Sequence, residues 1–284
     1  MFHLMEHLDP SPVSQAAIEP TPAVPLAEGE PATATVDRAL VLLQELGREG
    51  AALGVSELAR RVGLPKASTH RLLSTLARRG FVEREERRYR LGFVLVALGA
   101  AAARGDALIG AARPALEAGA ADVGETFFLV AERAGTLVVL DKVEGSGFVR
   151  AAPQVGAVVP SHATAVGKLY RAFAPDRLPH GIATTRFTEH TPGPRALAHD
   201  VAQARERGFA LNRDEWIEGL AVVAAPIFRP GRGADGRELA GALAVAASTP
   251  AMDRLGAERV AEDLRERAAA VTRRLGTESR REER

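Results

Sequence analysis

The sequence lacks cysteine altogether, so neither a disulfide nor a thiolate metal site can form in its 284 residues. It also lacks any run of about 18 consecutive apolar residues, and we therefore expect no membrane-spanning helix. The opening residues, MFHLMEHLDP, have neither the basic nor the apolar region of a secretory signal peptide. These absences predict a cytoplasmic protein. A hydrophobic content of 46% is enough for two domains with separate cores.

Lysine and arginine are absent from residues 1–34, which contain six of the seventeen prolines and five acidic residues. The apolar residues of this segment follow no helical or strand period. Such a segment has too little apolar surface to bury. We predict a disordered leader, with a partner-binding segment as the alternative. The last residues, 276–284, read GTESRREER and are expected to fray.

Motifs for catalysis or cofactor binding are missing. There is no GxSxG nucleophile elbow and no HExxH metal motif, and the glycine-rich GRGADGRELAG lacks the lysine of a phosphate-binding loop. A cluster of carboxylates is formed by Asp214, Glu215 and Glu218, which could hold a metal with His162 or His190. Their spacing matches no metal-binding motif, and surface charge is the alternative. We expect no enzyme, no cofactor and no metal.

The stretch from Val55 to Gly80, VSELARRVGLPKASTHRLLSTLARRG, carries the clearest functional signal. Ser56 is a suitable N-cap for a short helix that Gly63 ends. Pro65 suits the first turn of a second helix, because its missing N–H costs nothing there. The apolar side of that helix repeats at i, i+3, i+4 and i+7 and consists of Thr69, Leu72, Leu73 and Leu76. The spacing predicts a helix-turn-helix.

The opposite side of the second helix is polar and basic, which suits the major groove of a DNA duplex. We expect this helix to contact DNA through Lys66, Ala67, Ser68, Thr69, His70, Arg71, Ser74 and Arg78. Residues 60–90 contain ten Lys or Arg against three Glu, a net charge of +7, whereas the whole chain carries +1. Such asymmetry is typical of nucleic-acid binding. A packing unit with a solvated basic face is the alternative.

The flanking segments predict a winged helix-turn-helix over residues 35–91. Thr35 is expected to cap a first helix that Gly47 ends. The residues after Gly80 have the pattern of a short hairpin, whose Arg84, Arg87 and Arg88 would lie against the DNA backbone. Residues 92–106 are apolar on most sides but too short to span a bilayer. We expect a linker helix that is buried against a partner.

Residues 107–275 combine apolar strands with helices. Strands are expected at 126–131, 137–143, 148–152, 220–228 and 239–247, and helices from about 162, over 197–207 and over 252–275. Strands joined by glycine-containing turns, with the helices grouped between them, favour an antiparallel sheet covered by helices. The predicted fold class is therefore α+β.

Motifs in both halves resemble the IclR family of transcriptional regulators. The first half carries VDRALVLLQEL, the helix-turn-helix stretch and YRLG, and the second carries HATAVGK and DEWIEGL in the family's order. The resemblance runs from about Thr35 to about Leu275. It implies a winged helix-turn-helix joined by a helix to an effector-binding domain similar to GAF and PAS sensors. It also implies a homodimer or a dimer of dimers (a homotetramer).

The segment VVPSHATAVGK is expected to begin a helix whose first amides, those of Ser161, His162 and Ala163, can bind an anion. The alternative is that Ser161 only caps the helix and Gly167 only permits close packing. The resemblance favours binding, because small carboxylic acids are common effectors in the family. It further implies pocket positions at Phe148, Asn212, Val222, Ala246 and Ser248. An acidic residue is frequent in the family where Asn212 stands here, so no particular ligand carries over.

Together these features predict a DNA-binding transcriptional repressor whose operator affinity is controlled by a small organic acid. Because one helix-turn-helix contacts few base pairs, we expect a dimer or a dimer of dimers on a pseudo-palindromic operator. The alternative is a constitutive dimeric DNA-binding protein whose C-terminal domain only oligomerises. An enzyme fused to a DNA-binding domain is disfavoured by the missing catalytic motifs.

Overall fold

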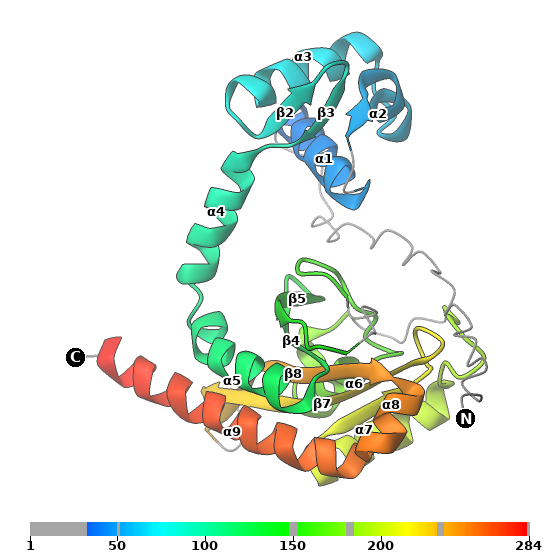
Figure 1. Ribbon diagram of the computed structural model, residues 1–284, viewed down its shortest axis with the longest axis vertical. Coiled ribbons are helices and arrows are strands. Elements are labelled where there is room, and N and C mark those ends of the chain that lie inside the picture. Colours follow the sequence, from blue (N-terminus) through cyan, green and yellow to red (C-terminus); the bar gives the residue numbers. More distant parts are fainter. Residues whose placement is uncertain (1–32, 50–51, 148–152, 180–184, 232–235, 283–284) are drawn as a thin grey trace, which may run out of the picture.

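The computed structural model describes residues 33–49, 52–147, 153–179, 185–231 and 236–282. Figure 1 shows a small N-terminal domain and a larger C-terminal domain joined by a single helix. The predicted leader, apart from its last two residues, lies outside the described residues, and so does the strand predicted at 148–152.

The N-terminal domain packs helices against a small sheet. Its elements are α1 (Ala34–Glu49), β1 (Leu53–Gly54), α2 (Val55–Arg61), α3 (Lys66–Arg78), β2 (Val82–Glu85) and β3 (Arg88–Leu91). The strands pair antiparallel in the order β1-β3-β2, which confirms the predicted hairpin. Leu42 and Leu46 of α1 meet Leu58 of α2 and Leu73 of α3 in a core where each is at most 2% exposed. This core fixes the orientation of α3.

The starts of α2 and α3 differ from the prediction. Gly54 is the N-cap of α2, so Ser56 lies inside the first turn and makes no capping bond. Pro65 is the N-cap of α3 rather than its first helical residue. In both cases the residue before the helix already has the extended or polyproline-like backbone that a cap requires. Gly63 has φ of 66°, as expected for a glycine that ends the first helix of the pair.

Helix α1 also differs from the prediction at both ends. Thr35 lies within the helix, which begins at Ala34, and the helix continues through Gly47 to Glu49. A glycine inside a helix costs only about 0.5–1 kcal/mol relative to alanine. Here its missing side chain brings the helix close to the hairpin, because a Cβ at Gly47 would lie 3.7 Å from Cδ1 of Leu91. Packing against the wing therefore outweighs the stop signal.

Helix α4 (Phe93–Arg104) is the predicted linker. None of its side chains is buried within this chain, and Phe93, Val96 and Leu98 are 72%, 62% and 51% exposed. The sequence did not indicate the helix that follows, α5 (Ala107–Val123), which Asp106 caps. Among the described helices, none alone has the length and apolar composition of a membrane span. The bent pair of α4 and α5, at 93° to one another, meets those criteria only when the two are taken together.

The C-terminal domain is built on a five-stranded sheet, which confirms the α+β class. Its strands are β4 (Thr126–Arg133), β5 (Thr136–Val143), β6 (Ala210–Arg213), β7 (Leu220–Pro230) and β8 (Arg237–Ser248). All neighbours are antiparallel, in the order β5-β4-β8-β7-β6. The short strand β6 at one edge was not predicted. The other predicted strands in the described residues are present, each slightly longer than expected.

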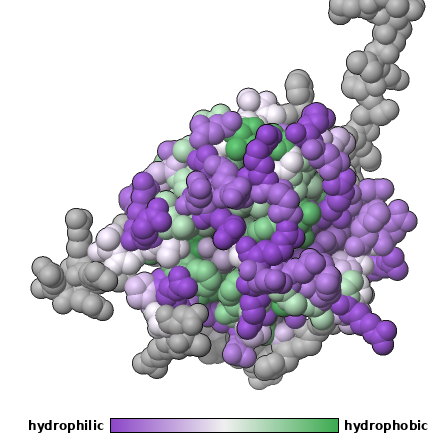
Figure 2. Space-filling model, turned by 90° about the horizontal axis from the view of Figure 1, so that it is seen from below, coloured by the Kyte–Doolittle hydropathy of each residue, from purple (hydrophilic) through white to green (hydrophobic). Residues whose placement is uncertain are grey.

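Helices cover both faces of this sheet (Figure 1). One face packs against α5 and α9 (Ala257–Glu282), and the other against α6 (Ala165–Phe173), beside which α7 (Pro194–Arg207) lies. A short 3₁₀ helix follows α6 at Pro175–Arg177. Seen from below in Figure 2, the surface is mainly hydrophilic, with hydrophobic residues in smaller patches between.

The last predicted helix of the C-terminal domain is interrupted and extends further than expected. The helix expected at 252–275 is two helices, α8 (Thr249–Leu255) and α9, separated by Gly256 at φ of 80°. A residue with that φ cannot continue a right-handed helix. Helix α9 extends to Glu282, so most of the tail predicted to fray is helical.

Candidate functional site

The recognition helix α3 presents a polar and basic side to solvent, as the sequence predicted. Lys66, Ala67, His70, Arg71 and Arg78 are exposed, and Ser68 and Ser74 are half-buried. In the described part of the chain, Lys66, Arg71 and Arg78 have no carboxylate within ion-pairing distance. Arg71 makes only a long contact to Ser68 Oγ, at 3.4 Å. These cations are therefore available to phosphates or base edges.

Thr69 is the exception among the predicted DNA contacts. Its side chain is fully buried beneath α3, and its hydroxyl donates to the carbonyl of Pro65 at 3.2 Å. The sequence had placed this residue both on the apolar side and among the DNA contacts. The structure resolves that conflict in favour of packing.

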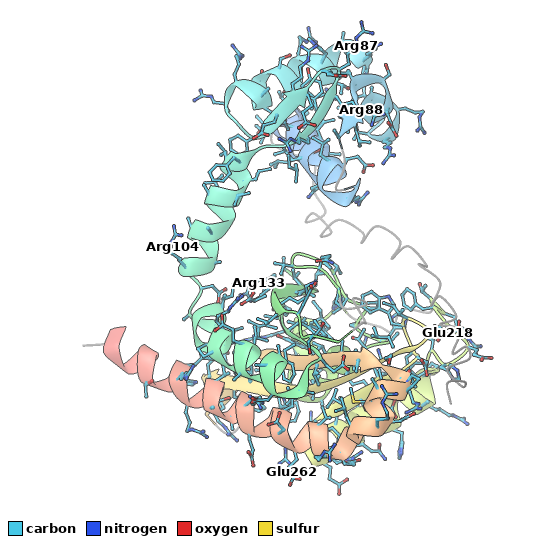
Figure 3. The ribbon with its side chains drawn as sticks, viewed as in Figure 1. Arg87, Arg88, Arg104, Arg133, Glu218 and Glu262 are labelled. Carbon is cyan, nitrogen blue, oxygen red and sulfur yellow. The ribbon has the colours of Figure 1, made fainter. Side chains whose placement is uncertain are left out.

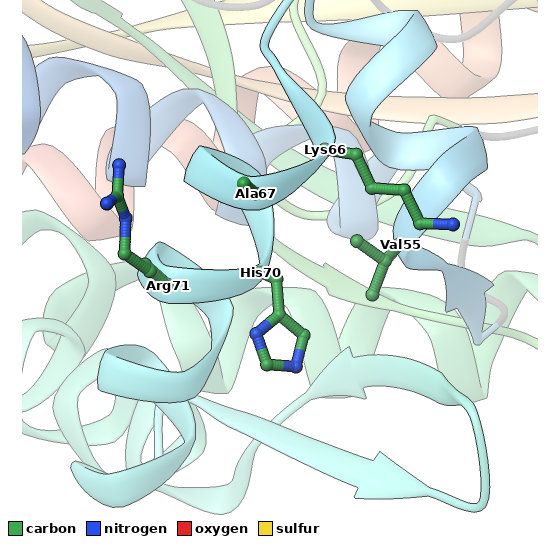
Figure 4. A pocket seen from close by; sticks show the side chains of 5 residues that line it. All are labelled: Val55, Lys66, Ala67, His70 and Arg71. Carbon is green, nitrogen blue, oxygen red and sulfur yellow. The ribbon is translucent and has the colours of Figure 1, made fainter.

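A shallow depression in the surface lies at the start of α3. It is lined by Val55, Lys66, Ala67, His70 and Arg71 (Figure 4). Figure 4 shows the Lys66 and Arg71 side chains pointing away to either side of Ala67, with His70 between them. A concave surface with two outward cations and one small residue gives the backbone of α3 room to approach a base pair.

The wing adds further cations near the same surface. Arg87 lies at the tip of the hairpin (Figure 3) and has no ion pair among the described residues. Arg84 and Arg88 donate to backbone carbonyls, those of Glu86 and Ala52, at 2.8 and 2.9 Å. Neither is paired with a carboxylate among the described residues. Arg90, in contrast, is paired with Glu83 and Glu85 at 2.8 and 3.0 Å, so its charge is compensated within the hairpin.

The turn before α6 differs from the prediction. Residues 161–164 form bends, and the helix begins at Ala165 with Thr164 as its N-cap. The Thr164 hydroxyl accepts from the amide of Gly167 at 3.1 Å and donates to the carbonyl of Pro160 at 2.6 Å. Ser161 is therefore not the cap, and Ser161, His162 and Ala163 lie in an irregular turn rather than a first helical turn. We call residues 161–164 the 161–164 turn.

Gly167 allows this turn to fold back on the helix. A Cβ at Gly167 would lie 2.3 Å from the carbonyl oxygen of Ser161, which no side chain could tolerate. The glycine thus packs closely, as the alternative interpretation of this segment expected, but against the turn of its own chain. Arg171, one turn further along α6, donates to the Ser161 carbonyl and hydroxyl at 3.1 and 3.0 Å. Its burial lowers the pKa of the guanidinium from its usual value.

The strand register brings several predicted pocket positions into one row. Asn212 of β6 is opposite Val222 of β7, Val222 is opposite Ala246 of β8, and Ala246 is opposite Thr126 of β4. Val222 and Ala246 belong to the core on the α6 face, and Thr126 faces the same way because its neighbour Phe128 does. The row lies beneath the helix that the 161–164 turn begins.

Thr126 was not among the predicted residues. Its side chain is 4% exposed, yet its hydroxyl makes no hydrogen bond with the described part of the chain. Register could have identified it, had the pairing of β4 with β8 been known. Ser248, two residues beyond Ala246, caps α8 by accepting from the amide of Ala251 at 3.3 Å. Phe148 lies outside the described residues.

The side-chain amide of Asn212 is buried, and both its nitrogen and its oxygen are hydrogen-bonded to the backbone. It is 2% exposed, its Nδ2 donates to the carbonyl of Ala163 at 2.9 Å, and its Oδ1 accepts from the amide of Glu215 at 3.2 Å. Asn212 therefore ties the 161–164 turn to the loop after β6. His162 in the same turn is also buried, bonded through Nε2 to the carbonyl of Thr185 at 2.8 Å and stacked on Phe187.

A buried ion cluster lies next to Asn212. The ammonium of Lys168 on α6 is 2.6 Å from Glu215 Oε1, 2.7 Å from Asp200 Oδ2 on α7, and 2.9 Å from the carbonyl of Leu211. Burial raises the pKa of Glu215, although Lys168 opposes the shift. Glu215 Oε2 is buried and has no hydrogen-bond partner among the residues that the structure describes. Within the described residues, no group of three His, Asp or Glu side chains is arranged to hold a metal ion.

Family models match both domains. The IclR helix-turn-helix domain matches residues 35–86, and the bacterial transcriptional regulator IclR C-terminal domain matches residues 100–273. This chain belongs to the IclR family of transcriptional regulators. The second match alone covers more than half of the chain, including the 161–164 turn and the sheet beneath it.

Relatives within the IclR family span nearly the whole chain. The HTH-type transcriptional regulator XynR of Escherichia coli K12 is 30% identical over 259 residues, 87% of this chain and 98% of XynR. The transcriptional repressor IclR of the same strain is 28% identical over 216 residues, 73% of this chain and 79% of the repressor. The crystal structure of an IclR homologue from Microbacterium hydrocarbonoxydans, complexed with 4-hydroxybenzoate, matches with a TM-score of 0.72 at 24% identity, covering 85% and 98% of the two chains.

Proposed function

We propose that this IclR-family regulator is a repressor whose affinity for a DNA operator is controlled by a small organic acid. The observation that carries the DNA part is the basic side of α3, which has no ion pair among the described residues. Lys66 and Arg71 line a concave surface at its start, and Arg78 is exposed at its end. Cations of this kind release counterions from phosphates, and arginine can read guanine in the major groove. Relatives such as the transcriptional repressor IclR of E. coli support repression. The protein acts by binding and has no enzymatic step.

A homodimer accounts for the linker helix. Exposed Phe93, Val96 and Leu98 on α4 would leave apolar surface in water, and a second copy of the same helix is a self-complementary cover for it. Two recognition helices related by a two-fold axis fit a pseudo-palindromic operator, with half-sites separated by a multiple of about 34 Å.

The effector site is proposed between the 161–164 turn and the sheet row of Asn212, Val222, Ala246 and Thr126. Val222 and Ala246 supply a small, apolar floor. The Thr126 hydroxyl supplies a hydrogen-bonding group with no partner in the described chain. The Arg171 guanidinium beside Ser161 supplies positive charge. A small carboxylic acid suits this combination, and the IclR homologue seen with 4-hydroxybenzoate is an example of such a complex in another protein.

Titrating acids into the protein–operator complex tests the proposal. A DNA fragment from upstream of the gene and a random duplex would be compared by fluorescence anisotropy, with keto, hydroxy and aromatic acids and with neutral sugars. We expect an acid to change the operator affinity at least about fivefold and to raise the melting temperature, since binding to the native state stabilises it. Trp216, the only tryptophan, lies beside the site and should report binding by its emission.

Two substitutions in the row provide matched controls. Ala246→Leu places a larger side chain in the proposed site and should abolish the effect of the acid on operator affinity. Thr126→Val keeps the shape of the side chain and removes only the hydroxyl, so it should weaken acid binding without preventing it. An operator affinity that responds to no acid, with tight and specific DNA binding retained, would instead support a constitutive DNA-binding protein.

A further inference from the structure

The C-terminal domain holds the linker helix at a single joint. No side chain of α4 is buried, and the chain bends by 93° between α4 and α5 at Gly105 and Asp106. The other end of α4 is fixed to the wing, because Gly92 donates to the carbonyl of Phe81 at 2.8 Å and a Cβ there would clash with Gly80. The direction of the recognition helix relative to the effector domain therefore depends on this joint.

Asp106 connects three elements at the joint. Its amide donates to the carbonyl of Ala103 in α4 at 3.3 Å. Its Oδ1 accepts from the amides of Leu108 and Ile109 in α5, at 2.9 and 3.2 Å. Its Oδ2 is 2.6 Å from Arg133, the last residue of β4. Arg133 appears in Figure 3 beside the start of α5, next to the lower end of α4.

The same end of β4 is bonded to α6. The pairing of β4 with β8 stops at Val130, which leaves the Glu132 amide without a strand partner on that side. The Tyr170 hydroxyl accepts from this amide at 2.9 Å. Tyr170 is fully buried, and its burial raises the pKa of the phenol to about 12, so it is neutral at any physiological pH. The N-cap of α6 is Thr164 in the 161–164 turn, six residues before Tyr170.

We propose that Tyr170 and the Arg133–Asp106 ion pair couple the effector site to the joint between α4 and α5. A displacement of α6 by a ligand at the 161–164 turn moves the end of β4 through Tyr170, and Arg133 passes this movement to Asp106. These are positioning residues that touch neither ligand nor DNA. The inference rests on the proposed ligand control of operator binding, and it assigns the route of that control.

The ion pair is suited to transmit movement rather than to hold the fold. The Arg133 and Asp106 side chains are 44% and 27% exposed, and ion pairs that are this accessible contribute little to stability. Removing Arg133 leaves Asp106 as the cap of α5, so the helix keeps its start. The chain also offers a matched control: Arg113, on the same helix α5, pairs with Asp141 of β5 and with Glu117 but lies away from the joint.

The first experiment needs no effector. Hydrogen exchange would be measured for the full-length protein and its Tyr170→Phe and Arg113→Ala variants. Tyr170→Phe removes the acceptor of the Glu132 amide, and we expect the Leu108 and Ile109 amides at the joint to exchange at least about fivefold faster as well. Arg113→Ala should leave these two amides unchanged. If Glu132 exchanges faster while Leu108 and Ile109 do not, the coupling route is wrong.

The second experiment uses an acid that alters the operator affinity of the wild type. We expect Arg133→Ala to bind this acid with unchanged affinity, read from Trp216 emission, while the ratio of operator affinities with and without acid falls at least about fivefold. Arg133→Lys should restore most of the ratio, because a lysine can still pair with Asp106. An unchanged ratio in Arg133→Ala overturns the inference. A wild type that responds to no acid overturns the proposed function, and the exchange experiment then still decides the coupling.

Discussion

The substitution Asn212→Asp gives the most specific test of how the 161–164 turn is held in place. The amide Nδ2 donates to the carbonyl of Ala163 at 2.9 Å in a position that is 2% exposed, and a carboxylate of the same shape has no donor to offer. The variant leaves the Ala163 carbonyl unsatisfied and sets a negative charge against it. Loss of a partner for a buried polar group costs about 1–3 kcal/mol, and burying the charge adds to it.

The deficit should depend on pH, because a protonated aspartic acid can donate to Ala163. Burial and the facing carbonyl raise the folded-state pKa of the introduced carboxyl above its unfolded value of about 3.9. A raised acid pKa contributes stability that is present below the unfolded pKa and is lost as pH rises through the folded pKa. Asn212→Asp should therefore approach the wild type in acid and fall furthest behind it at pH 8.

Urea denaturation of wild type, Asn212→Asp and Asn212→Ala at several pH values measures this. Asn212→Ala loses the hydrogen bonds without adding a charge, so its deficit relative to wild type should not change with pH. A deficit of Asn212→Asp that is the same at every pH, or absent, would show that Asn212 does not hold the turn through its donor.

Other substitutions test the remaining features. Arg71→Ala should cost about 1–3 kcal/mol of binding at the specific operator, whereas Lys66→Ala should weaken specific and random duplexes alike and reduce the salt slope by about one, both read from binding isotherms. Equal loss on both duplexes for Arg71→Ala would remove it from base readout. Val96→Glu should yield a monomer by light scattering at micromolar concentration, and a persistent dimer would place the interface elsewhere. Gly167→Ala should destabilise the protein by about 1–3 kcal/mol in denaturation, because its Cβ would lie 2.3 Å from the Ser161 oxygen, and no loss would contradict that contact.

Periodicity predicted the elements that have one polar and one apolar side. Helix α3, with Leu73 buried and Arg71 exposed, and the hairpin that follows it were recognisable for this reason. Helix α5 was missed because ALIGAARPALEAGAADV is small and apolar almost throughout, contains Pro114, and shows no clear 3.6-residue period. Its start was marked only by the N-cap residue Asp106, whose carboxylate accepts from the Leu108 and Ile109 amides, and one capping residue without a periodic pattern behind it does not identify a helix.

The candidate effector site could also be predicted only in part. The predicted strands include those of Val222 and Ala246, but β6, which carries Asn212, was not predicted. The register places Asn212, Val222 and Ala246 in one row. The sequence could not show which polar groups remain available to a ligand. Ser161 and Thr164 are both suitable N-cap residues, and only one of them can cap α6. Thr164 is the cap, because its hydroxyl accepts from the amide of Gly167. The Ser161 hydroxyl instead accepts from Arg171, ten residues along the chain.

This arrangement changes the physical basis for recognising an acid. We predicted that an anion binds the free amides of Ser161, His162 and Ala163 at a helix start. The helix begins instead at Ala165, and the amide of Gly167 in its first turn is bonded to Thr164. The positive charge at the turn comes instead from Arg171, whose guanidinium is half-buried and whose pKa burial lowers. A partly desolvated cation gains more from a carboxylate than an exposed one does, since fewer water molecules compete for it. If the proposed site binds an acid, we expect its selectivity over neutral sugars to depend on the charge of Arg171, which the irregular turn holds beside Ser161.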